Sequence, residues 1–389
     1  MTIKNKTVKL RTTDGFGKRV LDAFTESTFM VSVLVILLGF LTATVILLLI
    51  GKNPSGMYLA LLQVISGFDA SRGIRNVRYI GEWLVTSTPL ILCGLSMAFA
   101  ARTGLFNIGA EGQYIAGITA AQLTALYFPP IPVLHWISAM LAAIIAGAVW
   151  GGIAGFLKAR YRVSEVVTTI MMNYIALYIH RFITLNIPGS STYKTRDFPI
   201  TALISSPFLA SISNGSRLNY GLLFTITAVF LYWIIMERTV FGFSLQATGF
   251  NREASWYAGM KVKMNITLSM IISGAFAGLA GASVALGVFS YGRIMSSFDG
   301  YGFDGIAVAL AGNNTAAGTA LIGLLFGLLK SAQPLMQSRQ IPKEITSIII
   351  GLVVVFISLR YGLRIIIEWR MRKEYLKEKN KIKNDEGSG

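Results

Sequence analysis

A polar, glycine-rich stretch lies between two strongly apolar runs at residues 104–117, where the sequence reads GLFNIGAEGQYIAG. Its glycines lower helix propensity, and Asn107, Glu111 and Gln113 bring hydrogen-bonding groups into an otherwise apolar region. An acidic side chain at the centre of a membrane helix costs on the order of 2.5–3.5 kcal/mol. Non-helical backbone is tolerated at membrane depth only where it is buried in protein or lines a watery cavity. Two interpretations stay open: a polar path through a membrane protein, or an ordinary turn at the membrane surface with a solvated Glu111.

A second polar break follows at 299–314, where the sequence reads DGYGFDGIAVALAGNN. The apolar piece inside it has about nine residues and would be roughly 13 Å long as a helix. That is too short to cross a hydrocarbon core of about 30 Å. Two interrupted segments, one in each half of a chain, are typical of a transport pathway, whereas the alternative is an external loop that enters a normal span. The polar residues of this break are Asp299, Tyr301, Asp304, Asn313 and Asn314.

A short amphipathic segment, QATGFNREASWYAGM at 246–260, is bounded by glycines. Asn251 is suited to cap a helix from Arg252 to Tyr257, and Glu253 would lie in the first turn, where the helix dipole favours a negative charge. Such a helix between two membrane spans suits a docking element for a soluble partner. A surface helix that merely connects two spans is the alternative.

The composition shows which elements must position these residues. Of the 389 residues, 53% are hydrophobic and 14% are charged, and the mean hydropathy is +0.60. A soluble chain of this size needs about 25% charged residues to cover its surface. We therefore expect an all-α polytopic membrane protein with discontinuous helices. Its spans are expected near residues 28–50, 83–101, 113–128, 134–157, 164–184, 220–236, 265–289, 315–336 and 345–363, with a broken crossing before 315.

The distribution of positive charges favours about ten crossings with both termini in the cytoplasm. This arrangement places 23 Lys and Arg in cytoplasmic segments and 12 outside, whereas nine crossings give 17 and 18. The expected organisation is a basic cytoplasmic N-terminus at 1–27, a transmembrane domain at 28–363 and a basic, partly disordered cytoplasmic tail at 364–389. Segment 237–263 then forms the longest cytoplasmic loop, and 185–219 lies outside.

Several function classes are disfavoured by the same composition. The net charge of +17 resides largely at the two termini, which flank membrane spans, so nucleic-acid binding is not expected. Cys93 is the only cysteine, and His135 and His180 are too scattered for a metal site. The chain has no Walker A motif and no plausible nucleophile–base arrangement, so it is not expected to be an enzyme. The small residues of SGAFAGLAGASVALG at 273–287 instead predict close helix packing.

Taken together, these motifs resemble bacterial ABC-importer permeases of the branched-chain amino acid and ribose type, over residues 80 to 360. GFNREASWYAGMKV is similar to the family's cytoplasmic G-x-N-x-x-A-A-x-x-x-G-I element, with Ser255 in place of the second Ala and Met260 in place of Ile. SGAFAGLAGA and GYGFDGIAVALAGN follow in the family's order and spacing. GLFNIGAEGQ and GYGF most resemble the permeases of nucleoside importers served by basic-membrane-protein-type lipoproteins. Ribose permeases carry an aspartate where Asn107 stands.

The resemblance implies a nucleoside importer in a bacterial cell membrane. Its partners would be an ATPase subunit that uses ATP and Mg²⁺, a second, identical or homologous permease subunit, and an external binding lipoprotein; this chain would bind no cofactor. Glu111 would bond substrate hydroxyls or cap backbone amides freed by the break. Expected substrate-pathway residues are Phe106, Asn107, Glu111, Gln113, Asp299, Tyr301 and Asp304, and expected ATPase-coupling residues are Asn251, Arg252, Glu253, Ala254, Ser255 and Gly259.

Two alternatives stay open beside the nucleoside importer. One is an ABC permease for ribose-like sugars or branched-chain amino acids. The other, from a different class, is an ion-coupled secondary transporter, which would want acidic and basic groups paired in the middle of its spans. The predicted spans contain almost no such groups.

Overall fold

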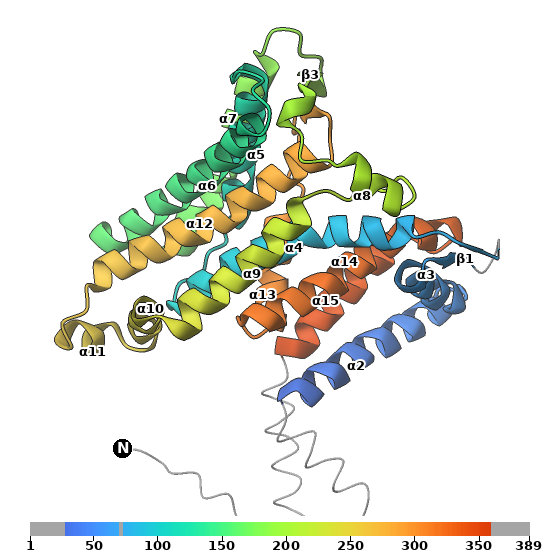
Figure 1. The fold of residues 1–389 in the computed structure, drawn as a ribbon. Coiled ribbons are helices and arrows are strands. Elements are labelled where there is room, and N and C mark those ends of the chain that lie inside the picture. The colour runs from blue at the N-terminus through green and yellow to red at the C-terminus, as the bar shows by residue number, and fades with distance from the viewer. Residues whose placement is uncertain (1–27, 70–72, 359–389) are drawn as a thin grey trace, which may run out of the picture. The chain divides into compact units, whose positions relative to one another are not determined.

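The computed structural model describes residues 28–69 and 73–358, which form mainly helices (Figure 1). The chain divides into two compact units. One comprises the segments up to Thr44 and from Gly351 onwards, and the other is Val45–Ile350, which contains both polar breaks and the 246–260 segment. The helices are α2 (Thr28–Leu49), α3 (Ser55–Ser66), α4 (Arg78–Arg102), α5 (Ala110–Tyr127), α6 (Leu134–Tyr161), α7 (Glu165–Leu185), α8 (Pro207–Ile212), α9 (Gly221–Arg238), α10 (Val240–Phe250), α11 (Arg252–Tyr257), α12 (Val262–Gly287), α13 (Tyr301–Ala311), α14 (Ala316–Ser338) and α15 (Glu344–Ser358), with a 3₁₀ turn at Ile200–Ala202.

Six helices among the described residues are long and apolar enough to cross a membrane: α4, α6, α7, α9, α12 and α14. The prediction of a helical, multi-pass membrane protein is confirmed at this level. The ten crossings and the cytoplasmic termini stay predictions, because 1–27 and 359–389 lie outside the described residues. Helix α13 has 11 residues, or about 16 Å at 1.5 Å per residue, so the second break does contain a helix too short to cross alone.

Helices α3 and α10 and two small sheets were not expected from the sequence. Helix α3 packs against α4 and α14, and α10 extends the segment before α11. The two strands β1 (Phe68–Asp69) and β2 (Ile74–Arg75) pair with each other, and β3 (Lys194–Asp197) pairs antiparallel with β4 (Tyr291–Arg293). The second sheet ties the connection after α7 to the segment that leads into the second break.

The core of Val45–Ile350 is built around α4 and α12, the most buried of the long helices. Helix α12 lies along α6 and α5, and α4 lies along α13 and α14 (Figure 1). The close packing predicted from small residues is confirmed where α12 meets α5 and α6. A Cβ on Gly117 would lie 2.6 Å from Gly278 Cα, and one on Gly147 would overlap the backbone of Gly274. These backbones touch, so no side chain fits between them.

Candidate functional site

The two polar breaks meet each other inside the bundle. Helix α5 begins just before Glu111, and α13 begins at Tyr301. The Glu111 carboxylate accepts the backbone N–H of Gly300 at 2.8 Å and that of Gly302 at 2.6 Å, and the residue is fully buried. A solvated Glu111 in a surface turn is therefore wrong. Of the two roles expected for Glu111, the structure shows the capping of backbone amides, and those amides belong to the second break.

Glycine is required where α13 approaches α5. Gly300 has φ of +83°, a left-handed conformation that glycine adopts without strain, and it precedes the first residue of α13. A Cβ on Gly302 would overlap the backbone of Glu111, so the two chains could not come this close with any other residue at that position. The glycines that mark the break in the sequence thus permit the contact between α13 and α5.

The backbone of the first break is held by a buried amide network. Asn107 donates to Gln113 Oε1 at 2.9 Å and to Ser273 Oγ at 2.7 Å, and its own Oδ1 accepts the N–H of Gly109 at 3.0 Å. Both Asn107 and Gln113 are buried between α4, α5 and α12. The neighbouring Phe106 is 38% exposed. The network supplies hydrogen-bond partners for backbone groups that the break leaves without helical partners. Such partners are required at membrane depth, where no bulk water can replace them.

Asn173 on α7 completes this arrangement and was missed in the sequence. Its Oδ1 accepts the N–H of Gly112 at 2.8 Å, and its Nδ2 donates to the carbonyl of Ile108 at 3.0 Å. Asn173 is buried, and it lies in the middle of an apolar span. An amide at such a position was the available signal, because an isolated polar group in a span needs a partner.

Ion pairs surround the N-terminal end of α13. Asp299 pairs with Arg293 and accepts the Tyr114 hydroxyl at 2.8 Å. Asp304 pairs with Lys330 of α14, whose Nζ lies 5.1 Å from the centre of the Tyr301 ring. Sequence reasoning missed both cations. Lys330 was visible as a charge within the predicted span 315–336, and such charges are paired when they face a protein interior.

A cavity of about 170 Å³ lies beside these ion pairs. Asp299, Tyr301 and Arg293 line it together with Arg217, which binds Glu82 of α4 through Nε and Nη2. The hydrogen bond to Glu82 raises the pKa of Arg217. Of the predicted pathway residues, the structure brings Asp299 and Tyr301 to this cavity, while Asp304 faces Lys330.

The expected helix at 252–257 is confirmed. Helix α11 spans Arg252–Tyr257, and the side chain of Asn251 caps it by accepting the Ala254 N–H at 2.9 Å. Glu253 lies in the first turn, and Ser255 is the buried member of the helix. Trp256 and Tyr257 are 65% and 82% exposed. Gly259, with φ of +81°, ends the segment.

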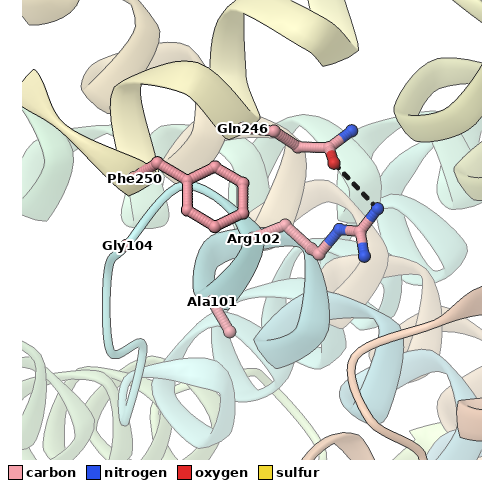
Figure 2. A pocket seen from close by; sticks show the side chains of 6 residues that line it. Ala101, Arg102, Gly104, Gln246 and Phe250 are labelled. Carbon is pink, nitrogen blue, oxygen red and sulfur yellow. Dashed lines mark hydrogen bonds between the residues drawn. The ribbon is translucent and has the colours of Figure 1, made fainter. Parts of the chain in front are cut away.

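The same segment touches the first break. Arg252 Nη2 donates to the carbonyl of Gly104 at 3.3 Å, and a Cβ on Gly104 would lie 2.9 Å from the carbonyl oxygen of Gly249. The end of α4, this loop and α10 line a cavity of about 180 Å³, where Arg102 donates to Gln246 at 2.9 Å. Figure 2 shows this hydrogen bond, with the ring of Phe250 beside Arg102. Helices α10 and α11 are thus in contact with the chain that leads into α5.

Comparison with known proteins decides the family. Residues 79–358 match the model of the branched-chain amino acid transport system/permease component family. The chain belongs to this family. It is 42% identical over 342 residues to the guanosine ABC transporter permease protein NupP of Bacillus subtilis, covering 88% of this chain and 96% of that one. It is 36% identical over 345 residues to the nucleoside ABC transporter permease protein NupB of Lactococcus lactis, covering 87% and 93%.

A sugar permease is also among the relatives. The glucose ABC transporter permease protein TsgB13 of Haloferax volcanii is 33% identical over 290 residues, covering 71% of this chain and 75% of that one. No solved structure matches the chain. Membership of the permease family makes the chain a multi-pass membrane transport component rather than an enzyme, and it decides against an ion-coupled secondary transporter.

Proposed function

We propose that this permease is the membrane-spanning subunit of an ATP-driven importer that carries nucleosides. The observation that carries the proposal is its likeness, over nearly the whole of both chains, to permeases named for guanosine and nucleosides. The cavity beside the second break agrees with an uncharged solute, because its charged side chains are matched in pairs. Arg217 is bound to Glu82, and Arg293 to Asp299.

The nearest alternative substrates are sugars and branched-chain amino acids. An amino acid carries two charges of its own, and each would need an unpaired partner on the protein. The paired charges around the cavity do not offer this. A sugar is uncharged, as a nucleoside is, and a glucose permease is among the relatives. The uptake experiment must therefore distinguish a sugar from a nucleoside.

The proposed complex contains a separate ATPase, which uses ATP and Mg²⁺, and a second permease subunit, identical or homologous. This chain itself binds no cofactor. We place the ATPase on α10 and α11, where Phe250, Trp256 and Tyr257 are exposed and an aromatic surface is available to a soluble partner. An external lipoprotein would deliver substrate at the opposite end of α12, near 185–219 and 290–303. In this orientation the chain crosses the membrane ten times, with both termini in the cytoplasm.

A continuous series of contacts supports a route from the ATPase to the cavity. Arg252 of α11 holds the carbonyl of Gly104, the loop after Gly104 leads to Glu111, and Glu111 holds the amides of Gly300 and Gly302. Movement of α11 would therefore shift the first break and, through it, the N-terminus of α13. Alternating access of this kind needs two discrete packings whose balance ATP binding changes.

The substrate is tested by uptake of radiolabelled guanosine, adenosine, uridine, ribose and leucine in cells with and without the gene. We expect loss of the gene to abolish nucleoside uptake while ribose and leucine uptake persist. Intact nucleoside uptake with lost ribose or leucine uptake would retain the permease and refute the nucleoside substrate.

The coupling route is tested by Arg252→Gln, which removes the charged donor to Gly104 and leaves the exposed aromatic side chains of α11 in place. We expect the complex to assemble. Its ATP hydrolysis should no longer be coupled to transport, so that the amount of nucleoside taken up per ATP hydrolysed falls several-fold. Lys261→Gln removes an exposed charge close by and serves as the matched control. Equal uptake per ATP in the two variants would contradict the route.

A further inference from the structure

The cavity beside Asp299 offers hydrogen-bonding groups that the protein leaves unused. The Asp299 carboxylate accepts both Nη groups of Arg293 and the hydroxyl of Tyr114. A carboxylate has about four acceptor sites, so Oδ1 keeps one. Arg217 uses Nε and Nη2 for Glu82, and its Nη1 has no hydrogen-bond partner among the described residues.

Two hydroxyl groups complete this set. The Tyr301 hydroxyl has no hydrogen-bond partner in the part of the chain that the structure describes, although its ring lines the cavity. The Thr86 hydroxyl donates to the carbonyl of Glu82 at 2.8 Å and can still accept. The cavity therefore combines donors from Arg217 and Tyr301 with acceptors on Asp299 and Thr86. Alternating donors and acceptors around one small space suit a ligand that carries several hydroxyl groups.

The size of the cavity limits what it can hold. Its volume of about 170 Å³ is well below the roughly 300 Å³ at which pockets for whole drug-sized ligands begin. One ring of a nucleoside is therefore the largest part that it can enclose. The remaining walls, which include Pro89, Val284 and Phe289, are apolar and suit the carbon face of that ring.

The aromatic side chains around the cavity indicate that the enclosed ring of the nucleoside is the sugar rather than the base. A base binds best by stacking on an open aromatic face. Arg293 lies over the Phe289 ring at 4.7 Å, and Lys330 lies over the Tyr301 ring at 5.1 Å. Tyr114 also packs edge-on against Tyr301, with 5.7 Å between the ring centres. The cations occupy one face of each of these two rings, which leaves less open aromatic surface for a base.

We propose that this cavity holds the ribose of the nucleoside, with Asp299 and Thr86 accepting from its 2′- and 3′-hydroxyl groups and Arg217 and Tyr301 donating to them. The assignment rests on the proposed nucleoside import and adds to it the part of the substrate that the permease recognises. The base then extends out of the cavity, so nucleosides with different bases share the same contacts.

Tyr301→Phe tests the proposal because it removes one hydroxyl and keeps the ring. The assay compares uptake of guanosine and of 2′,3′-dideoxyguanosine, with the same lipoprotein and ATPase throughout, so that their own preferences cancel. We expect the variant to lower guanosine uptake roughly fivefold, as for one neutral hydrogen bond, and to leave dideoxyguanosine uptake unchanged. Thr86→Val should show the same selective loss. Tyr127→Phe, at an exposed tyrosine, is the matched control, and the amount of permease in the membrane is measured for each variant.

The outcomes separate the two proposals. If Tyr301→Phe and Thr86→Val lower the uptake of both nucleosides equally, or of neither, the ribose contact is wrong and nucleoside import stands. If the unaltered protein imports free ribose and no nucleoside, nucleoside import is refuted. Sensitivity of that ribose uptake to Tyr301→Phe would then assign the cavity to a free pentose.

Discussion

Glu111→Gln separates the two roles that a buried acid in the first break could have. The carboxylate accepts two backbone N–H groups, from Gly300 and Gly302, and is removed from solvent. A glutamine has one carbonyl oxygen and one NH₂ group, so it can accept one of these N–H groups and must turn donors toward the other. The substitution keeps the size of the side chain and removes the second acceptor and the charge.

The expected cost follows from these two contacts. A hydrogen bond to a charged acceptor contributes about 1.5–3 kcal/mol, and a buried N–H left without a partner costs about 1–3 kcal/mol. In the variant, one N–H loses its partner, and the bond to the other N–H weakens to neutral strength, about 1 kcal/mol. Together these changes give an expected net loss of about 3 kcal/mol in the stability of the α5–α13 contact. For a chain of this length that loss lowers the melting temperature by roughly 4 °C.

Thermal unfolding of the purified permease in detergent, without nucleoside, measures this effect. Glu344→Gln, at an exposed glutamate at the start of α15, is the matched control and should melt as the unaltered protein does. A melting temperature for Glu111→Gln equal to that of the control would refute the capping role. If the melting temperature is unchanged and the KM for guanosine rises, Glu111 contacts the substrate.

Two further predictions concern the packing that holds the breaks. Asn173→Leu leaves the N–H of Gly112 and the carbonyl of Ile108 unpaired, so we expect about 2–4 kcal/mol of destabilisation by thermal unfolding. Asn186→Leu, at an exposed amide, should have little effect, and equal melting of the two variants would contradict the role of Asn173. Gly147→Leu forces a side chain into the backbone of α12, so we expect little folded permease in membranes by immunoblot; normal amounts would show that α6 and α12 can separate.

How far the sequence predicts the structure depends on whether a signal is local. The bounds of α11 follow from Asn251, whose side chain caps the helix within three residues. The short helix of the second break follows from the length of its apolar piece. Close packing along α12 follows from its small residues, because small side chains let the backbones of neighbouring helices approach closely.

What could not be predicted requires partners distant in the chain. Glu111 binds amides 189 and 191 residues away, and a single sequence offers no pairing information at that separation. The β3–β4 sheet joins strands of four and three residues that are about 100 residues apart, too short to show an alternating pattern. Asn173 and Lys330 were visible as polar residues within spans, but their partners depend on how the helices pack.

Charge balance explains how two polar breaks can meet in the interior of a membrane protein. The N-termini of α5 and α13 each carry roughly half a positive elementary charge, so the single carboxylate of Glu111, placed between them, neutralises both. Asp299 and Asp304 then remain to neutralise Arg293 and Lys330. Separating α5 from α13 would leave a buried charge without a partner, which is far more costly than moving the two helices together. We therefore expect the breaks to move as one body during transport, with the change of packing along α4, against which both helices lie, and along α12, against which α5 lies.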